Sequence, residues 1–122
     1  MSKNKTILIV DDDKSVISIF DFVLKGTGYQ TITAQNGLEC LDILQSKAVD
    51  LIFLDVKMPG MTGIDIFKEI QKKHPSQLVV LMTGYSEDEL VKEAFTLGAY
   101  GIIYKPFDME EVLSVIDKIL QD

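Results

Sequence analysis

The residues best suited to chemistry in this chain follow short apolar runs. The run "ILIV" is followed by three acids at 11–13, and "LIFL" is followed by Asp55. Two later runs end just before Thr83 and Lys105. If each run is a strand of one parallel sheet, these residues meet at the carboxyl edge of that sheet, where α/β proteins collect functional groups. Carboxylates, a hydroxyl group and an ammonium group would then share one site.

Acids gathered at one edge must be neutralised. Two carboxylates about 4 Å apart repel each other by roughly 4 kcal/mol at an effective dielectric constant near 20, so a proton or a cation has to be present. Oxygen ligands without nearby His or Cys favour a hard ion such as Mg²⁺. An anionic nucleophile, Mg²⁺, a lysine and a hydroxyl group are the parts of phosphoryl transfer. We therefore predict that Asp55 accepts a phosphoryl group, with Lys105 and Thr83 facing the transferred oxygens.

The elements that would position these residues alternate along the chain. Aliphatic runs lie at 6–10, 31–34, 50–54, 78–82 and 101–104, and segments of helical spacing lie at 14–25, 38–47, 64–73, 87–97 and 109–120. Several runs are continuously apolar, as expected for strands covered on both faces. Strict alternation predicts a parallel sheet with right-handed crossovers and helices on both sides. The predicted fold class is α/β, a three-layer (βα)5 sandwich.

Polar residues mark the predicted helix ends. Asp13 is placed to cap the first helix, and the segment 86–89 has the spacing of a capping box for the fourth. Asp108 and Glu111 have the same spacing before the fifth helix. Proline at position 75 should stop the third helix at the residue before it.

Composition indicates the class of protein. The chain has 122 residues, a net charge of −7, and only Lys among its twelve basic residues. This length predicts one domain, 1–122. An acidic chain without Arg is a poor nucleic-acid binder, and no apolar run is long enough to suggest membrane insertion. The single Cys40 is expected to pack in the core, and the absence of a signal-peptide pattern predicts a cytoplasmic location.

Four motifs, "ILIVDDD", "LIFLDVKMPGMTG", "LMTG" and "YKPF", resemble in order and spacing the receiver domain of two-component response regulators. The resemblance covers essentially the whole chain and implies a five-stranded parallel sheet in the flavodoxin-like order 2-1-3-4-5. It implies that Asp55 is the phosphoacceptor and that Asp12 is a direct Mg²⁺ ligand. Asp11 would act mostly through water, and the main-chain carbonyl of Lys57 would be another ligand.

The same resemblance implies contacts and partners. Thr83 and Lys105 would contact the acyl phosphate, and the Lys105–Pro106 bond would be cis. The phosphodonor would be a sensor histidine kinase or a histidine phosphotransfer protein, and the target a downstream effector protein or output domain. The chain is expected to be a monomer, or a dimer once phosphorylated. Further motifs such as "GYQT" and "MTGYSE" are similar to those of single-domain regulators in sporulation phosphorelays, which suggests a relay role.

Several residues depart from the family pattern or invite a specific role. Ile102 stands where the family has its switch aromatic, and we expect the nearby Tyr104 on the opposite strand face. Gly84 replaces a frequent Ala and would leave the pocket open. Lys57 and Tyr85 should overhang the phosphorylated aspartate, where they would slow hydrolysis by water.

The first helical segment, "KSVISIFDFVLK", is apolar around more of its circumference than one buried face requires. Two interpretations are open. The additional residues are buried against the fifth helix, or Val16, Ile17 and Phe20 dock the helix bundle of a phosphodonor.

Two other functions are also open. The stretch "ILIVDDDKS" is similar to the Asp-x-Asp signature of haloacid-dehalogenase-type phosphatases, in which Asp11 would be the nucleophile; "MPG" and "KPF" are then unexplained. A phosphorylation-independent binding module would leave a complete acceptor site without a use. The labelled residue separates these functions, because a receiver carries the phosphoryl group on Asp55 and a phosphatase on Asp11.

Overall fold

The computed structural model describes residues 5–58, 60, 62–84, 92–93, 96 and 98–120. The strands are β1 (Thr6–Val10), β2 (Gln30–Ala34), β3 (Leu51–Asp55), β4 (Val79–Thr83) and β5 (Gly101–Tyr104). The helices are α1 (Lys14–Gly26), α2 (Gly37–Ser46), α3 (Gly63–Lys73) and α5 (Met109–Ile119). The predicted fourth helix, together with its capping box at 86–89, falls largely outside the described residues.

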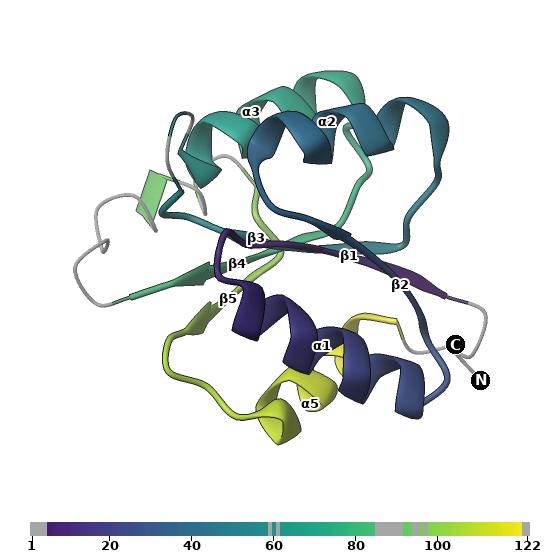
Figure 1. The fold of residues 1–122 in the computed structure, drawn as a ribbon. Helices are drawn as coiled ribbons and strands as arrows, with labels where there is room; N and C mark the ends of the chain where they lie inside the picture. Colours follow the sequence, from purple (N-terminus) through teal and green to yellow (C-terminus); the bar gives the residue numbers. More distant parts are fainter. Residues whose placement is uncertain are drawn as a thin grey trace.

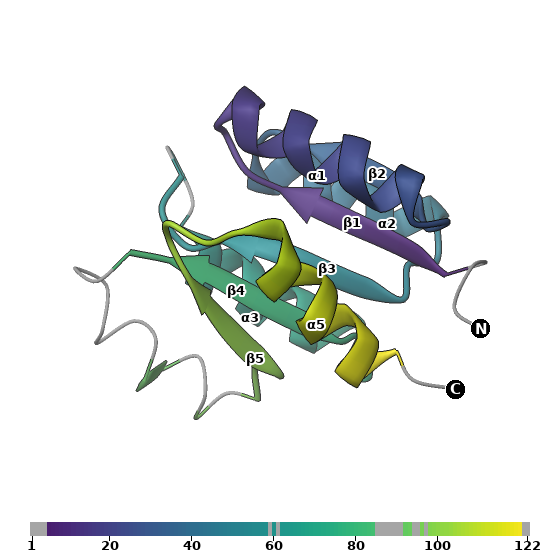
Figure 2. The ribbon, with the colours of Figure 1, turned by 90° about the horizontal axis from the view of Figure 1, so that it is seen from below.

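The five strands form one parallel sheet in the order β2-β1-β3-β4-β5. Helices α2 and α3 cover one face, and α1 and α5 cover the other (Figure 1). Figure 2 shows α1 and α5 side by side in front of the sheet. The predicted α/β sandwich and strand order are confirmed, and each named element begins and ends within one residue of its prediction.

Each strand supplies side chains to two apolar layers, because successive side chains point to opposite faces. Leu8 and Leu54 belong to the layer under α2 and α3. Ile9 and Phe53 belong to the layer under α1 and α5. Burial on both sides explains why these strands are continuously apolar. Within the described ranges, no helix combines the length and hydrophobicity of a membrane span.

Side chains cap the helix ends as their chemistry predicts. The Asp13 carboxylate accepts from the Ser15 N–H at 2.9 Å, which confirms it as the N-cap of α1. Asp108 caps α5 by accepting from the N–H of Glu111 at 2.9 Å. Helix α3 carries a full capping box between Thr62 and Asp65, which our sequence reading had missed.

Candidate functional site

The polar residues predicted to do chemistry lie at the carboxyl edge of the sheet. Val10 pairs with Leu54 across β1 and β3, so Asp11 and Asp55 are level with each other. Asp11 is fully buried, and Asp55 is 4% exposed. A polar pair this deeply buried requires compensating charge or hydrogen bonds.

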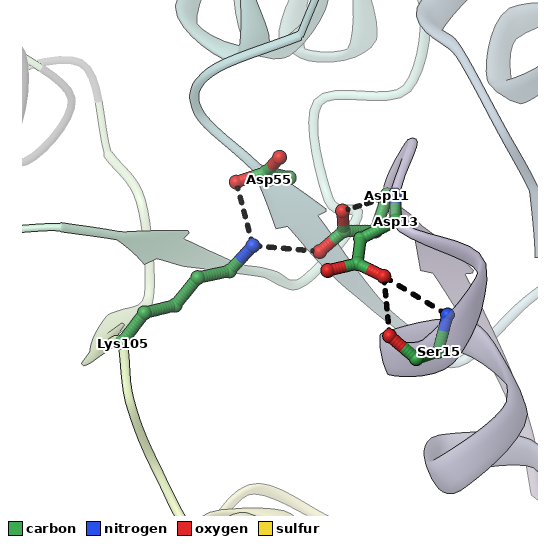
Figure 3. Close-up of polar contacts among 5 residues, drawn as sticks. All are labelled: Asp11, Asp13, Ser15, Asp55 and Lys105. Atoms are coloured by element: carbon green, nitrogen blue, oxygen red, sulfur yellow. Dashed lines mark hydrogen bonds and ion pairs between the residues drawn. The ribbon is translucent and has the colours of Figure 1, made fainter.

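Lys105 supplies part of that compensation. Its Nζ atom lies 2.9 Å from Oδ2 of Asp11 and 3.3 Å from Oδ1 of Asp55, and so bridges the two acids (Figure 3). Its own backbone N–H donates to the carbonyl of Thr83 at 2.7 Å, which ties β5 to the end of β4. The bond from Lys105 to Pro106 is cis, as the family resemblance implied.

The acids are held by further contacts. The second carboxylate oxygen of Asp11 accepts from the backbone N–H of Asp13 at 2.9 Å. Asp11, Asp12 and Asp55 each offer an oxygen, and these three oxygens lie within 4.8 Å of one another. Three clustered carboxylate oxygens without His or Cys fit a hard divalent cation such as Mg²⁺.

The electrostatics of Asp55 reflect this crowding. Burial raises the pKa of Asp55 to about 6, and the charge of Asp11 acts in the same direction. The Lys105 charge and a hydrogen bond from the Lys57 backbone lower this pKa in part. For Lys105, burial favours the neutral amine, but the hydrogen bond to Asp11 and the charge of Asp55 outweigh it and raise its pKa. The carboxylates of the site carry more negative charge than Lys105 neutralises, and this excess favours the binding of a cation.

Most of the predicted site residues line a pocket of about 300 Å³, and Thr83 at the end of β4 is not among them. Its lining consists of Asp11, Asp12, Asp13, Asp55, Lys57, Gly84 and Lys105. Thr83 is 2% exposed, and its hydroxyl group donates to the Gly84 carbonyl at 3.1 Å. Lys57 is exposed at the pocket rim. Tyr85, expected beside Lys57, is outside the described residues.

Of the two interpretations of the first helix, the structure contradicts docking at Phe20 and supports burial beside the fifth helix. Phe20 is 1% exposed, with ring centroids 5.2 Å from Phe53 and 5.7 Å from Phe107, so it is a core residue that offers almost no surface to a partner. Val16 and Ile17 are half-buried against the same layer, to which α5 contributes Val112 and Ile116, so burial beside the fifth helix accounts for part of the wide apolar arc of α1.

Tyr104 was expected on the strand face opposite Ile102. Ile102 packs under α2 and α3, whereas Ile103 lies in the other layer. Residues two positions apart share a strand face, so Tyr104 lies on the same face as Ile102 and is 39% exposed. The aromatic side chain on this face is therefore two positions further along β5 than the family's switch residue.

Comparison with known proteins supplies the family. The profile of the response regulator receiver domain matches residues 7–117. This chain belongs to the receiver domain family. Among curated proteins it is similar to the "Sporulation initiation phosphotransferase F" of Bacillus subtilis, at 40% identity over 96% of this chain and 94% of the relative. It is also 36% identical to the transcriptional regulator NtrC of Klebsiella pneumoniae, covering 92% of this receiver domain but only 24% of NtrC.

Solved receiver domains have the same fold. A CheY-like protein of Methanospirillum hungatei has a TM-score of 0.90 at 29% identity, covering 94% of this chain and 92% of that one. CheY4 of Vibrio cholerae has a TM-score of 0.90 at 30% identity, covering 96% and 99%. The chain is thus a phosphoryl-acceptor domain of two-component signalling, and neither the phosphatase nor the phosphorylation-independent module is favoured.

Proposed function

We propose that this receiver domain, comprising residues 1–122, accepts a phosphoryl group from a phosphohistidine onto Asp55. The observation that carries the proposal is the buried Asp55 carboxylate, placed 3.3 Å from the Lys105 ammonium group and beside two further acids. Such a group is nucleophilic when ionised and is surrounded by the charges that phosphoryl transfer needs. The domain is a signalling acceptor that assists its own phosphorylation, and it is not a metabolic enzyme.

In the proposed transfer, one oxygen of Asp55 forms a bond to phosphorus as the P–N bond to the donor imidazole breaks. The imidazole nitrogen keeps the electron pair of that bond. Lys105 neutralises charge on one equatorial oxygen, and the Thr83 hydroxyl group donates to another. Thr83 ends β4 and Lys105 directly follows the neighbouring β5, so the sheet sets their positions relative to Asp55.

Mg²⁺ fits the remaining donors. Asp11, Asp12 and Asp55 would hold the ion, with the main-chain carbonyl of Lys57 as a further ligand. The ion supplies positive charge for the carboxylates and the phosphoryl oxygens. The same charge favours the ionised form of Asp55, whose pKa burial raises to about 6.

The donor is a sensor histidine kinase or a histidine phosphotransfer protein, and the similar Bacillus subtilis protein is named a sporulation initiation phosphotransferase. An apolar pocket of about 410 Å³ is lined by Val16, Ile19, Phe20, Lys105, Pro106, Phe107 and Met109. Its position would let a donor helix approach Asp55 while it covers apolar surface. This location keeps Val16 as a docking candidate, although Phe20 is buried.

Phosphorylation of Asp55 would switch the binding of partners. A phosphoryl group replaces the carboxylate charge of Asp55 with a bulkier dianion that draws on Thr83 and Lys105. Because Thr83 ends β4 and Lys105 directly follows β5, the change would reach the face of the predicted fourth helix, β5 and α5. A downstream effector protein or output domain, or a second phosphorylated copy, would read that face. We place the protein in the cytoplasm, without direct contacts to nucleic acid or insertion into membranes.

The assignment of Asp55 is tested by labelling with radioactive acetyl phosphate in the presence of Mg²⁺. Asp55→Asn should take up no stable label, because an amide cannot form the acyl phosphate. The control Asp42→Asn removes an exposed carboxylate on α2 and should label as the wild type does. Normal labelling of Asp55→Asn, or label mapped to Asp11, would refute the proposal and revive the phosphatase.

A further inference from the structure

Gly63 begins α3 directly against the backbone that carries the acceptor. Its N–H donates to the carbonyl of Val56 at 2.7 Å. A Cβ atom added to Gly63 would lie 2.3 Å from the carbonyl oxygen of Asp55 and 2.6 Å from the Cα atom of Val56. Both are backbone atoms, which cannot rotate away as the end of a side chain can. Position 63 therefore accepts no side chain while α3 keeps its place.

This requirement differs from that of the other glycines. Gly60 and Gly98 have φ angles of +85° and +106°, so glycine is favoured at both positions because it adopts this backbone conformation readily. Gly63 does not have a positive φ; glycine is required there because a Cβ atom would have no space. A Cβ atom on Gly37 would also clash, at 2.1 Å, but with Cδ1 of Ile66, a side-chain atom that can move. A Cβ atom on Gly26 would meet nothing within 4 Å.

The backbone that Gly63 touches holds the site. Val56 is fixed from two sides, because its N–H donates to the carbonyl of Met82 on β4 at 2.9 Å and its own carbonyl accepts from Gly63. Asp55 precedes it, and Lys57 follows it with a backbone hydrogen bond to the Asp55 carboxylate. The orientation of the acceptor carboxylate thus depends on where Val56 is held.

We propose that Gly63 is a positioning residue for this site. The close approach of α3 fixes the backbone at residues 55–57 and thereby the spacing of Asp55 from Asp11 and Asp12. This inference rests on the proposed function, because it takes the acidic cluster to bind Mg²⁺. Ordinary contacts of a Cβ atom begin at 3.4 Å, so a methyl group at position 63 must displace α3 or this backbone appreciably. Functional constellations tolerate displacements of only about 0.5 Å.

The test is a Mg²⁺ titration followed by amide chemical shifts, a readout that needs no phosphorylation. Gly63→Ala should weaken Mg²⁺ binding about tenfold or more, as is usual when the groups that orient metal ligands are disturbed. Gly26→Ala should bind Mg²⁺ as the wild type does. Gly37→Ala should unfold at lower urea yet keep wild-type Mg²⁺ affinity, which separates lost stability from lost positioning.

The possible outcomes separate the positioning role of Gly63 from the proposed Mg²⁺ site. Absence of Mg²⁺ binding by the wild type would refute the proposed metal site, and this inference with it. Wild-type binding with equal affinity in Gly63→Ala would overturn the positioning role alone, as would an equal loss in Gly37→Ala. If Gly63→Ala is unfolded in buffer, the titration is repeated in trimethylamine N-oxide, which favours the folded state. A chain that stays unfolded there would also overturn the inference, since Gly63 would then serve folding.

Discussion

The Lys105 ammonium group lies between two buried carboxylates and compensates only part of their charge. It is 2.9 Å from Asp11 and 3.3 Å from Asp55, yet the pKa of Asp55 remains raised to about 6 because burial opposes ionisation. One positive charge cannot balance two desolvated negative charges. This deficit is the physical reason to expect a divalent cation beside Asp12 and the rim of the pocket.

Lys57 is the residue we expect to influence the lifetime of the phosphoryl group on Asp55. Its side chain is exposed at the rim of the acidic pocket, where we expect it to restrict the approach of water to a phosphorylated Asp55. Replacing Lys57 with the smaller Asn and Tyr85 with Glu, which can orient water, should accelerate loss of the phosphoryl group severalfold. The measurement is the decay of label from the purified acyl phosphate in Mg²⁺.

The matched control for this prediction is Lys47→Asn. Lys47 is also exposed but follows α2, at the opposite edge of the sheet. Lys47→Asn lowers the net charge by one, as Lys57→Asn does by itself, and should leave the decay unchanged. A decay in the Lys57 and Tyr85 double variant that is no faster than in the wild type would refute a shielding role.

The apolar side chains of helix α1 are of two kinds, those buried in the core and those exposed to solvent. Phe20 faces inward, in contact with Phe53 of β3 and Phe107 of the loop after β5. Phe22 is 81% exposed, and Ile19 is 52% exposed. The helix packs on the sheet and beside α5 (Figure 2), which buries an unusually wide arc and still leaves apolar side chains in solvent.

Two substitutions in α1 test this division. Phe20→Ala should lower the free energy of unfolding by about 3–5 kcal/mol, because it removes a ring from a packed core and leaves a cavity. Phe22→Ala removes the same atoms from the surface and should change stability by no more than about 0.5 kcal/mol. Urea denaturation measures both values. Similar losses in the two variants would contradict the orientation of α1.

At the scale of the whole molecule, the buried acceptor couples stability to pH. The pKa of Asp55 is raised from 3.8 to about 6 by burial, so the folded state binds this proton more tightly than the unfolded state. The stabilisation from Asp55 is therefore complete below pH 3.8 and is lost as pH rises through about 6. A shift of about 2 units corresponds to roughly 3 kcal/mol.

The variant Asp55→Asn isolates this effect, because an amide does not titrate. Without metal, wild type and variant should be similarly stable near pH 4, and the variant should be more stable by about 3 kcal/mol at pH 7. Adding Mg²⁺ at pH 7 should stabilise the wild type more than the variant. Parallel pH profiles from urea denaturation in the two proteins would show that Asp55 is not held as the structure describes.

The fold was accessible from the sequence because its signals are local. Continuous apolar runs, helical spacing and caps such as Asp13 each depend on a few neighbouring residues, and the observed strands and helices follow them closely. The candidate site residues Asp55, Thr83 and Lys105 were found because parallel strands bring their carboxyl ends to one edge. The strand face of Tyr104 was predicted wrongly because the alternation of side chains along β5 was miscounted. The sequence was sufficient to place Tyr104 on the same face as Ile102.

Other features required the folded molecule. The sequence alone was sufficient to predict the candidate site residues and the order of the strands and helices. Tertiary packing decided the raised pKa of Asp55, the burial of Phe20 in place of Phe22, and the contact between Gly63 and the acceptor backbone. These depend on distances between segments far apart in sequence, and only close packing of the layers sets such distances.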